Sequence, residues 1–223
     1  MQNKEPCMTT SHVRILVVDD ERNIRTNLGM VLEATGCQVD TAENGEEALT
    51  KSKEQHYDIA FVDLQMPKVS GLELTRFLRA VSNATAVVIL TALGSVASAV
   101  EAMKLGAVDF LEKPFDPKGI QLLVNEILLR KEFGPGGSVE DLLHLAELAR
   151  ARKAHVEARA YLKTAMVRDL TRPEPYYWLG VLCDQEGDTR QAAHYYYMAL
   201  DVSPTFRPAR EALMKLGRMS PER

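Results

Sequence analysis

The stretch YDIAFVDLQMP, residues 57–67, decides the fold of the first half of the chain. Residues 59–62 are all apolar, which is typical of a strand buried on both faces of a parallel sheet. Asp63 follows directly, at the carboxyl end of this strand, where open α/β sheets place their sites. Taken alone, this carboxylate could cap a helix, bind a metal or act as a nucleophile.

Four further apolar runs accompany this strand in the first half of the chain. They lie at residues 13–18, 37–42, 86–91 and 107–112, and segments of helical character lie at 21–35, 46–53, 72–81, 95–105 and 117–131. Strands that alternate with helices form βαβ units. The pattern therefore predicts one parallel sheet of five strands with helices on both faces.

The residues at the strand ends carry the chemistry. The first strand runs into Asp19 and Asp20, the fourth ends on Thr91, and the fifth runs into Lys113. Because the carboxyl ends of parallel strands share one edge of the sheet, we expect these residues to converge on Asp63. Three clustered carboxylates repel one another, and a hard cation such as Mg²⁺ relieves that repulsion. The edge therefore predicts a place for a phosphoryl group, with Asp63 as its nucleophile.

This set of residues resembles the receiver domain of bacterial two-component response regulators. The resemblance covers about residues 12–132 and is carried by Asp19-Asp20, Asp63 with Met66-Pro67 after it, Thr91-Ala92, and Phe110 three residues before Lys113-Pro114. It implies a flavodoxin-like α/β fold with strand order 2-1-3-4-5. It also implies Mg²⁺-dependent phosphorylation of Asp63 by a sensor histidine kinase. Around residues 91–94 and 106–115 the sequence is most similar to receivers of the nitrogen-regulator subgroup.

The resemblance also implies roles for single residues. The implied Mg²⁺ ligands are Asp19, Asp20, Asp63 and the main-chain carbonyl of Gln65. The implied phosphoryl contacts are Thr91, Ala92 and Lys113. Thr91 and Phe110 are implied as switch residues, the ring of Phe110 turning inward when Thr91 moves.

The second half of the chain shows an internal repeat with a period of about 34 residues. It resembles tetratricopeptide (TPR) repeats, most clearly at Tyr176, Leu179, Gly180, Ala192, Tyr196, Ala199 and Pro204. A weaker copy lies one period earlier, at Leu142, Leu145, Ala146, Ala158, Leu162 and Ala165. Cys183 and Leu170 depart from the pattern, and an unrelated helical bundle is the alternative.

These patterns predict the domain organisation. We expect a loose leader at 1–11, a receiver domain at 12–132, a linker at 133–138, a TPR-like domain at 139–217 and a tail at 218–223. The TPR-like domain comprises repeats at 139–172 and 173–206 and a capping helix at 207–217. Two repeats bury little surface by themselves. Since the helix at 117–131 is apolar around nearly its whole circumference, we expect its outer face to meet the first repeat or a second subunit.

Composition limits the classes of function. The net charge is −4, divided into −5 for residues 1–132 and +1 for residues 133–223, and no basic block favours nucleic acid. We interpret Arg150, Arg152 and Lys153 as a solvated helix end, and the tyrosines and Trp178 of the second half as part core and part groove. The three cysteines are predicted to be free thiols. With no long apolar run, the chain is predicted to be cytoplasmic, without contact to a membrane.

The favoured interpretation is a response regulator whose helical half binds an unknown protein partner, with homodimerisation as a further possibility. One alternative is a transcriptional regulator with a helical nucleic-acid-binding output, which the charge of the second half opposes. Another is a phosphohydrolase that uses Asp63, although Gln65 stands where such enzymes often need a second carboxylate. We expect no enzyme activity beyond self-dephosphorylation.

Overall fold

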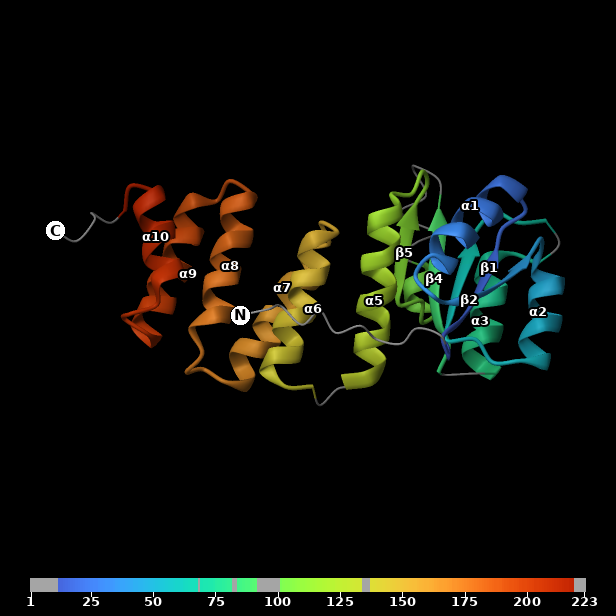
Figure 1. Cartoon of the computed structure of the whole chain (residues 1–223), viewed down its shortest axis with the longest axis horizontal. Helices are drawn as coiled ribbons and strands as arrows, with labels where there is room; N and C mark the ends of the chain where they lie inside the picture. The colour runs from blue at the N-terminus through green and yellow to red at the C-terminus, as the bar shows by residue number, and fades with distance from the viewer. Residues whose placement is uncertain (1–11, 68, 82–83, 92–100, 134–136, 219–223) are drawn as a thin grey trace. The chain divides into compact units, whose positions relative to one another are not determined.

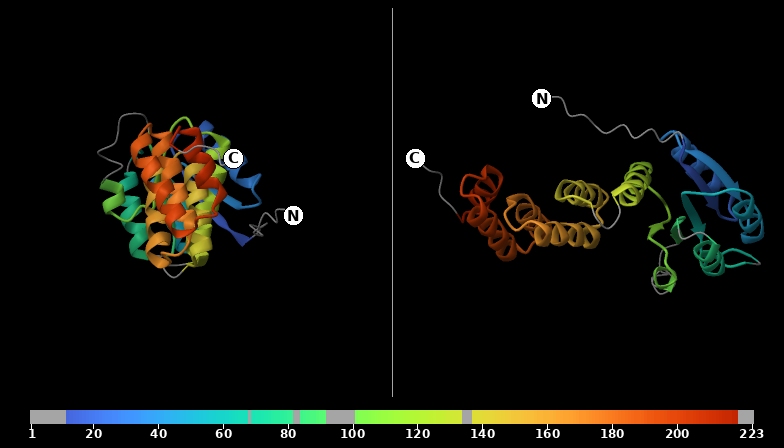
Figure 2. Two further views of the ribbon diagram at one scale, coloured as in Figure 1. Left: turned by 90° about the vertical axis from the view of Figure 1, so that its left-hand side faces the viewer. Right: turned by 90° about the horizontal axis from the view of Figure 1, so that it is seen from below.

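The computed structural model describes residues 12–67, 69–81, 84–91, 101–133 and 137–218 (Figures 1 and 2). They form two compact units, which divide between Gln121 and Leu122. The predicted leader, residues 134–136 of the predicted linker, residues 219–223 of the predicted tail and the first part of the helix expected at 95–105 lie outside the described residues. None of the described helices is both long and apolar enough to cross a membrane.

A five-stranded parallel sheet forms the centre of the first unit. Its strands are β1 (Arg14–Val18), β2 (Gln38–Ala42), β3 (Ile59–Asp63), β4 (Ala86–Thr91) and β5 (Asp109–Glu112). They lie in the order β2-β1-β3-β4-β5, as predicted. Every residue of β3 and β4 is buried, because each strand has a neighbour on both sides and its side chains face the core.

The helices of the first unit each have apolar residues on one face, and these faces pack in the interior of the unit. They include α1 (Arg22–Glu33), α2 (Gly45–Glu54) and α3 (Gly71–Val81). Helix α1 packs on β1 and β2, whereas α2 and α3 pack against each other. Gly71 starts α3 directly against the end of β3, where an added Cβ would lie 2.1 Å from the main-chain oxygen of Asp63. Only glycine therefore fits at position 71, where the start of α3 comes this close to the main chain of Asp63.

Helix α5 (Pro117–Phe133) begins in the first unit and ends in the second. The Asp116 carboxylate accepts a hydrogen bond from the main-chain N–H of Gly119 at 2.9 Å and so caps the start of this helix. The remaining helices are α6 (Val139–Ala151), α7 (His155–Arg168), α8 (Pro173–Gln185), α9 (Thr189–Val202) and α10 (Arg207–Lys215). The first residues of α6 and α8, and likewise those of α7 and α9, are separated by one period of the sequence repeat, so the helices recur as the pattern predicts.

Small residues let these helices pack closely in sequence order, each against the next from α6 to α10 (Figure 2). The side chains of Ala146, Ala158 and Ala192 are buried. An added Cβ at Gly180 would lie 2.5 Å from the Tyr196 ring, so this glycine permits α8 to approach α9. The observed packing is compatible with TPR repeats, and the assignment to that family stays a prediction.

A buried acid joins the C-terminal part of α5 to the first helix pair. The Glu126 side chain is fully buried and accepts hydrogen bonds from Arg152 Nε at 2.7 Å, from the Tyr161 hydroxyl at 3.0 Å and from Arg130. Arg152 follows α6, and Tyr161 lies on α7. These contacts confirm that α5 meets the first of the predicted repeats. The units accordingly divide within α5, earlier in the chain than the expected linker at 133–138.

Candidate functional site

A lysine ammonium links two buried carboxylates at the carboxyl edge of the sheet. Lys113 Nζ lies 2.7 Å from Asp19 Oδ2 and 2.9 Å from Asp63 Oδ1. The Asp19 side chain is fully buried, and that of Asp63 is 8% exposed. Three residues that are far apart in the sequence therefore converge, as the strand ends predicted.

The backbone at the strand ends fixes the direction of these side chains. The main-chain N–H of Glu21 donates to Asp19 Oδ1, and that of Gln65 donates to Asp63 Oδ2, both at 2.9 Å. The main-chain N–H of Lys113 donates to the carbonyl of Thr91 at 2.8 Å, which ties the end of β5 to the end of β4. Thr91 itself is 6% exposed. Each carboxylate thus has one oxygen held by the backbone and one facing Lys113.

The electrostatic balance differs between the two partners of this ion pair. Burial raises the pKa of the Asp63 carboxyl above its ordinary value, and the hydrogen bond and charge of Lys113 offset this only in part. Burial also acts to lower the pKa of Lys113, but its hydrogen bonds to Asp19 and Asp63 outweigh that effect and raise it. The edge therefore holds a firmly protonated ammonium and a carboxylate that is short of positive charge.

In the described part of the chain, the other predicted residues form no ion pair with Lys113. Asp20, Gln65 and Phe110 are exposed, with Phe110 at 48%, and Ala92 lies outside the described residues. Among the residues that the structure describes, no three His, Cys, Asp or Glu side chains are gathered to hold a metal. The oxygen donors of Asp19 and Asp63 still suit a hard cation, because one ammonium balances only one of their two charges. The Mg²⁺ site stays a prediction.

The interpretation of Arg150 and Arg152 as a solvated helix end is wrong. Arg152 is 11% exposed and bound to Glu126, and the Arg150 guanidinium lies 4.9 Å from the centroid of the Trp178 ring. Lys153 adopts a left-handed conformation with φ +63° at the α6–α7 turn, and Gly187, at the matching position of the second repeat, has φ +83°. In the sequence, the turn at Lys153 is indicated only by Gly187, which lies one repeat period later and is a typical turn residue. Both arginine contacts join separate helices, which local charge patterns do not reveal.

Comparison with known proteins identifies the family to which the first unit belongs. Residues 15–125 match the family model described as response regulator receiver domain. The transcriptional regulatory protein ResD of Bacillus subtilis (strain 168) is 37% identical over 150 residues, which are 66% of this chain and 62% of that protein. The probable transcriptional regulator ycf27 of Cyanophora paradoxa is 40% identical over 125 residues, which are 56% of this chain and 52% of that protein. The chain thus spans only part of the length of these curated relatives.

A solved structure has the same fold over the same region. The response regulator receiver domain protein from Clostridium thermocellum is 35% identical, with a TM-score of 0.52, and the match covers 54% of this chain and 97% of that structure. A complete receiver structure therefore corresponds to about the first half of this chain.

Proposed function

We propose that this chain, whose residues 15–125 form a response regulator receiver domain, is a phosphorylation-controlled switch for protein–protein association. In this proposal a sensor histidine kinase phosphorylates Asp63, and the helical unit binds a protein partner. The observation that carries the proposal is the placement of Asp63 at the end of β3, with Lys113 Nζ 2.9 Å away. The chain then turns over no separate substrate, and self-dephosphorylation is its own reaction.

Each residue at the carboxyl edge of the sheet has its own role in the proposed phosphoryl transfer. A carboxylate oxygen of Asp63 attacks the phosphorus, the bond from phosphorus to the kinase histidine breaks, and an acyl phosphate forms. Lys113 holds one phosphoryl oxygen by its positive charge, and the Thr91 hydroxyl contacts another. Asp19, Asp20, Asp63 and the carbonyl of Gln65 would hold Mg²⁺, which neutralises charge on the transferring group. Thr91 and Phe110 then relay the change to the surface of the receiver.

The helical unit supports an output by association. Its helices recur with a period of about 34 residues, and Gly180 against Tyr196 gives the close pairing that TPR repeats use. Repeat arrays of this kind present an extended surface to a partner. The phosphoryl group favours one receiver state by its differential contacts, and that state changes partner binding or self-association.

The first experiment combines phosphorylation and capture. The full chain is incubated with Mg²⁺ and a small acyl phosphate, and its intact mass is measured. We expect one added phosphoryl group, and none in Asp63→Asn, with the exposed Asp201→Asn as the matched control. A pull-down with and without beryllofluoride then tests the output. A phosphoryl group retained in Asp63→Asn contradicts the receiver assignment, and partner capture that ignores beryllofluoride contradicts the switch.

A second candidate is regulation of transcription through the helical unit. The names of ResD and ycf27 as transcriptional regulators favour it. It predicts that the chain binds duplex DNA, with an affinity that falls as salt concentration rises, since phosphate contacts release counterions. A fluorescence-anisotropy titration of labelled DNA at two salt concentrations separates this candidate from the first.

A further inference from the structure

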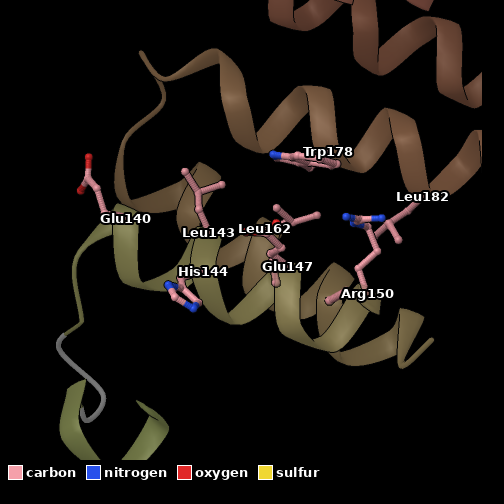
Figure 3. Close-up of a pocket in the computed structure, with 10 residues that line it drawn as sticks. Glu140, Leu143, His144, Glu147, Arg150, Leu162, Trp178 and Leu182 are labelled. Carbon is pink, nitrogen blue, oxygen red and sulfur yellow. The ribbon is translucent and has the colours of Figure 1, made fainter. Parts of the chain in front are cut away.

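The helical unit contains an apolar hollow with a charged end (Figure 3). Its volume is ≈ 280 Å³. Helix α6 forms one wall, α8 forms the facing wall, and α7 contributes to the floor. The apolar lining comes mainly from Leu143, Leu162, Trp178 and Leu182. A space of this size and lining suits an apolar side chain of a ligand.

The charged end of the hollow is the guanidinium of Arg150. Its central carbon, Cζ, lies over the Trp178 ring at 4.9 Å from the ring centroid, and both side chains extend into the space between α6 and α8 (Figure 3). Within the described part of the chain, Arg150 Nε is buried and has no hydrogen-bond partner. A guanidinium carries five N–H donors in one plane, and stacking on a ring leaves those donors available at its edge. The geometry thus offers a fixed, partly buried donor edge beside an apolar space.

The acidic residues around the hollow do not use this donor edge. Glu140 forms an ion pair with Arg172. Glu147 lies one turn before Arg150 on α6 and is exposed, and in the described residues no ion pair joins the two. His144 lies between these glutamates on the same helix. The buried donor without a partner is therefore Arg150 Nε, so a ligand with an acceptor group is the complementary one.

We propose that this hollow binds a peptide segment in which a carboxylate adjoins an apolar side chain. The apolar group fills the space between Leu143, Leu162 and Leu182, and the carboxylate accepts hydrogen bonds from the edge of Arg150. This inference rests on the proposed function, because it names the chemistry of the partner that the helical unit takes. It also assigns Trp178 the role of positioning the Arg150 guanidinium through a cation–π contact.

Trp178 makes the proposal directly testable, since it is the only tryptophan in the chain. The full chain is titrated with acetyl-Leu-Asp-Leu-amide, and the tryptophan fluorescence is recorded. We expect a saturable change with this probe, and binding at least about tenfold weaker for the matched Asn and Lys peptides, because a charged acceptor strengthens the hydrogen bonds. Equal binding of the Asp and Lys peptides overturns the proposal.

Variants of Arg150 complete the test. Arg150→Gln is expected to abolish the preference for the Asp peptide, and Arg150→Lys to weaken it, because an ammonium lacks the planar donor edge. Lys163→Gln, an exposed position on α7, is the control and should bind like the wild type. Circular dichroism confirms that each variant is folded. An unchanged peptide preference in folded Arg150→Gln overturns the proposal.

The same titration separates this inference from the switch. If the Asp peptide binds wild type and Asp63→Asn alike, with or without beryllofluoride, the peptide site stands and its control by phosphorylation fails. If Asp63 accepts a phosphoryl group but the chain shows no preference for the Asp peptide, the peptide site fails and the receiver assignment stands.

Discussion

Each half of the molecule buries a carboxylate, but the surroundings of the two acids differ. In the receiver, Asp63 and Asp19 share the one ammonium of Lys113, at 2.9 and 2.7 Å. In the helical unit, Glu126 faces two guanidinium groups, from Arg130 and Arg152, together with the hydroxyl of Tyr161. The first cluster thus has more negative than positive charge, and the second has the reverse.

This difference in charge distinguishes a candidate reactive site, at Asp63, from a structural contact between helices, at Glu126. Burial leaves the pKa of Asp63 raised, because Lys113 compensates for it only partly. Burial acts in the same direction on Glu126, yet the hydrogen bonds and charges of Arg152 and Arg130 lower its pKa overall. A carboxylate short of positive charge can gain from a cation or react, whereas a fully paired carboxylate holds helices together. Three predictions test this contrast.

The largest effect is expected from Glu126→Gln. This change leaves two buried or half-buried guanidinium groups without their anion, and we expect the helical unit to lose about 3 kcal/mol of stability. Urea unfolding followed by the fluorescence of Trp178 measures it, since this tryptophan lies in the helical unit.

Glu132→Gln is the matched control on the same helix. Glu132 is exposed, so its replacement should change stability by no more than about 0.5 kcal/mol. If the two variants unfold at the same urea concentration, the Glu126 cluster does not stabilise the unit and the contrast with Asp63 fails.

The sequence predicted the receiver because its pattern is local. The apolar run at 59–62 and the residues Asp19, Asp63 and Lys113 each follow from position along a single strand. A parallel sheet then brings the strand ends to one edge, so the cluster could be predicted without knowledge of any side-chain packing. The same rule did not predict that Asp20 and Phe110 would be exposed, because exposure depends on how each loop and strand surface is covered.

The helical unit was predictable in its period but not in its contacts. The regular repeat gave the helices, and small residues such as Gly180 gave their close pairing. The partners of Glu126 lie 26 and 35 residues further along the chain, at Arg152 and Tyr161. Helical periodicity identifies an apolar face but not the residue that it will contact, which is why Arg152 was misinterpreted as solvated.

The second prediction makes the same chemical change at the other acid. Asp63→Asn removes one of the two buried anions that share Lys113, so we expect the receiver unit to be stabilised by about 1 kcal/mol in a buffer that contains a chelator. Calorimetry of the full chain measures it, with the exposed Glu54→Gln as control. Destabilisation of the kind expected for Glu126→Gln would show that Asp63 is a structural contact as well.

The smallest effect is the acid dependence of the Glu126 cluster. The folded pKa of Glu126 lies below its unfolded value, so its stabilising contribution is complete above about pH 4.3 and is lost as the pH falls through the folded pKa. Its partners do not titrate in this range, because arginine stays protonated and burial raises the pKa of the Tyr161 hydroxyl. The urea midpoints of wild type and Glu126→Gln should therefore converge as the pH is lowered, whereas those of wild type and Glu132→Gln should keep a constant difference. If the difference in urea midpoint between wild type and Glu126→Gln widened in acid, the protonated form of Glu126 would be the stabilising one. The charged, fully paired carboxylate would then not be what holds these helices together.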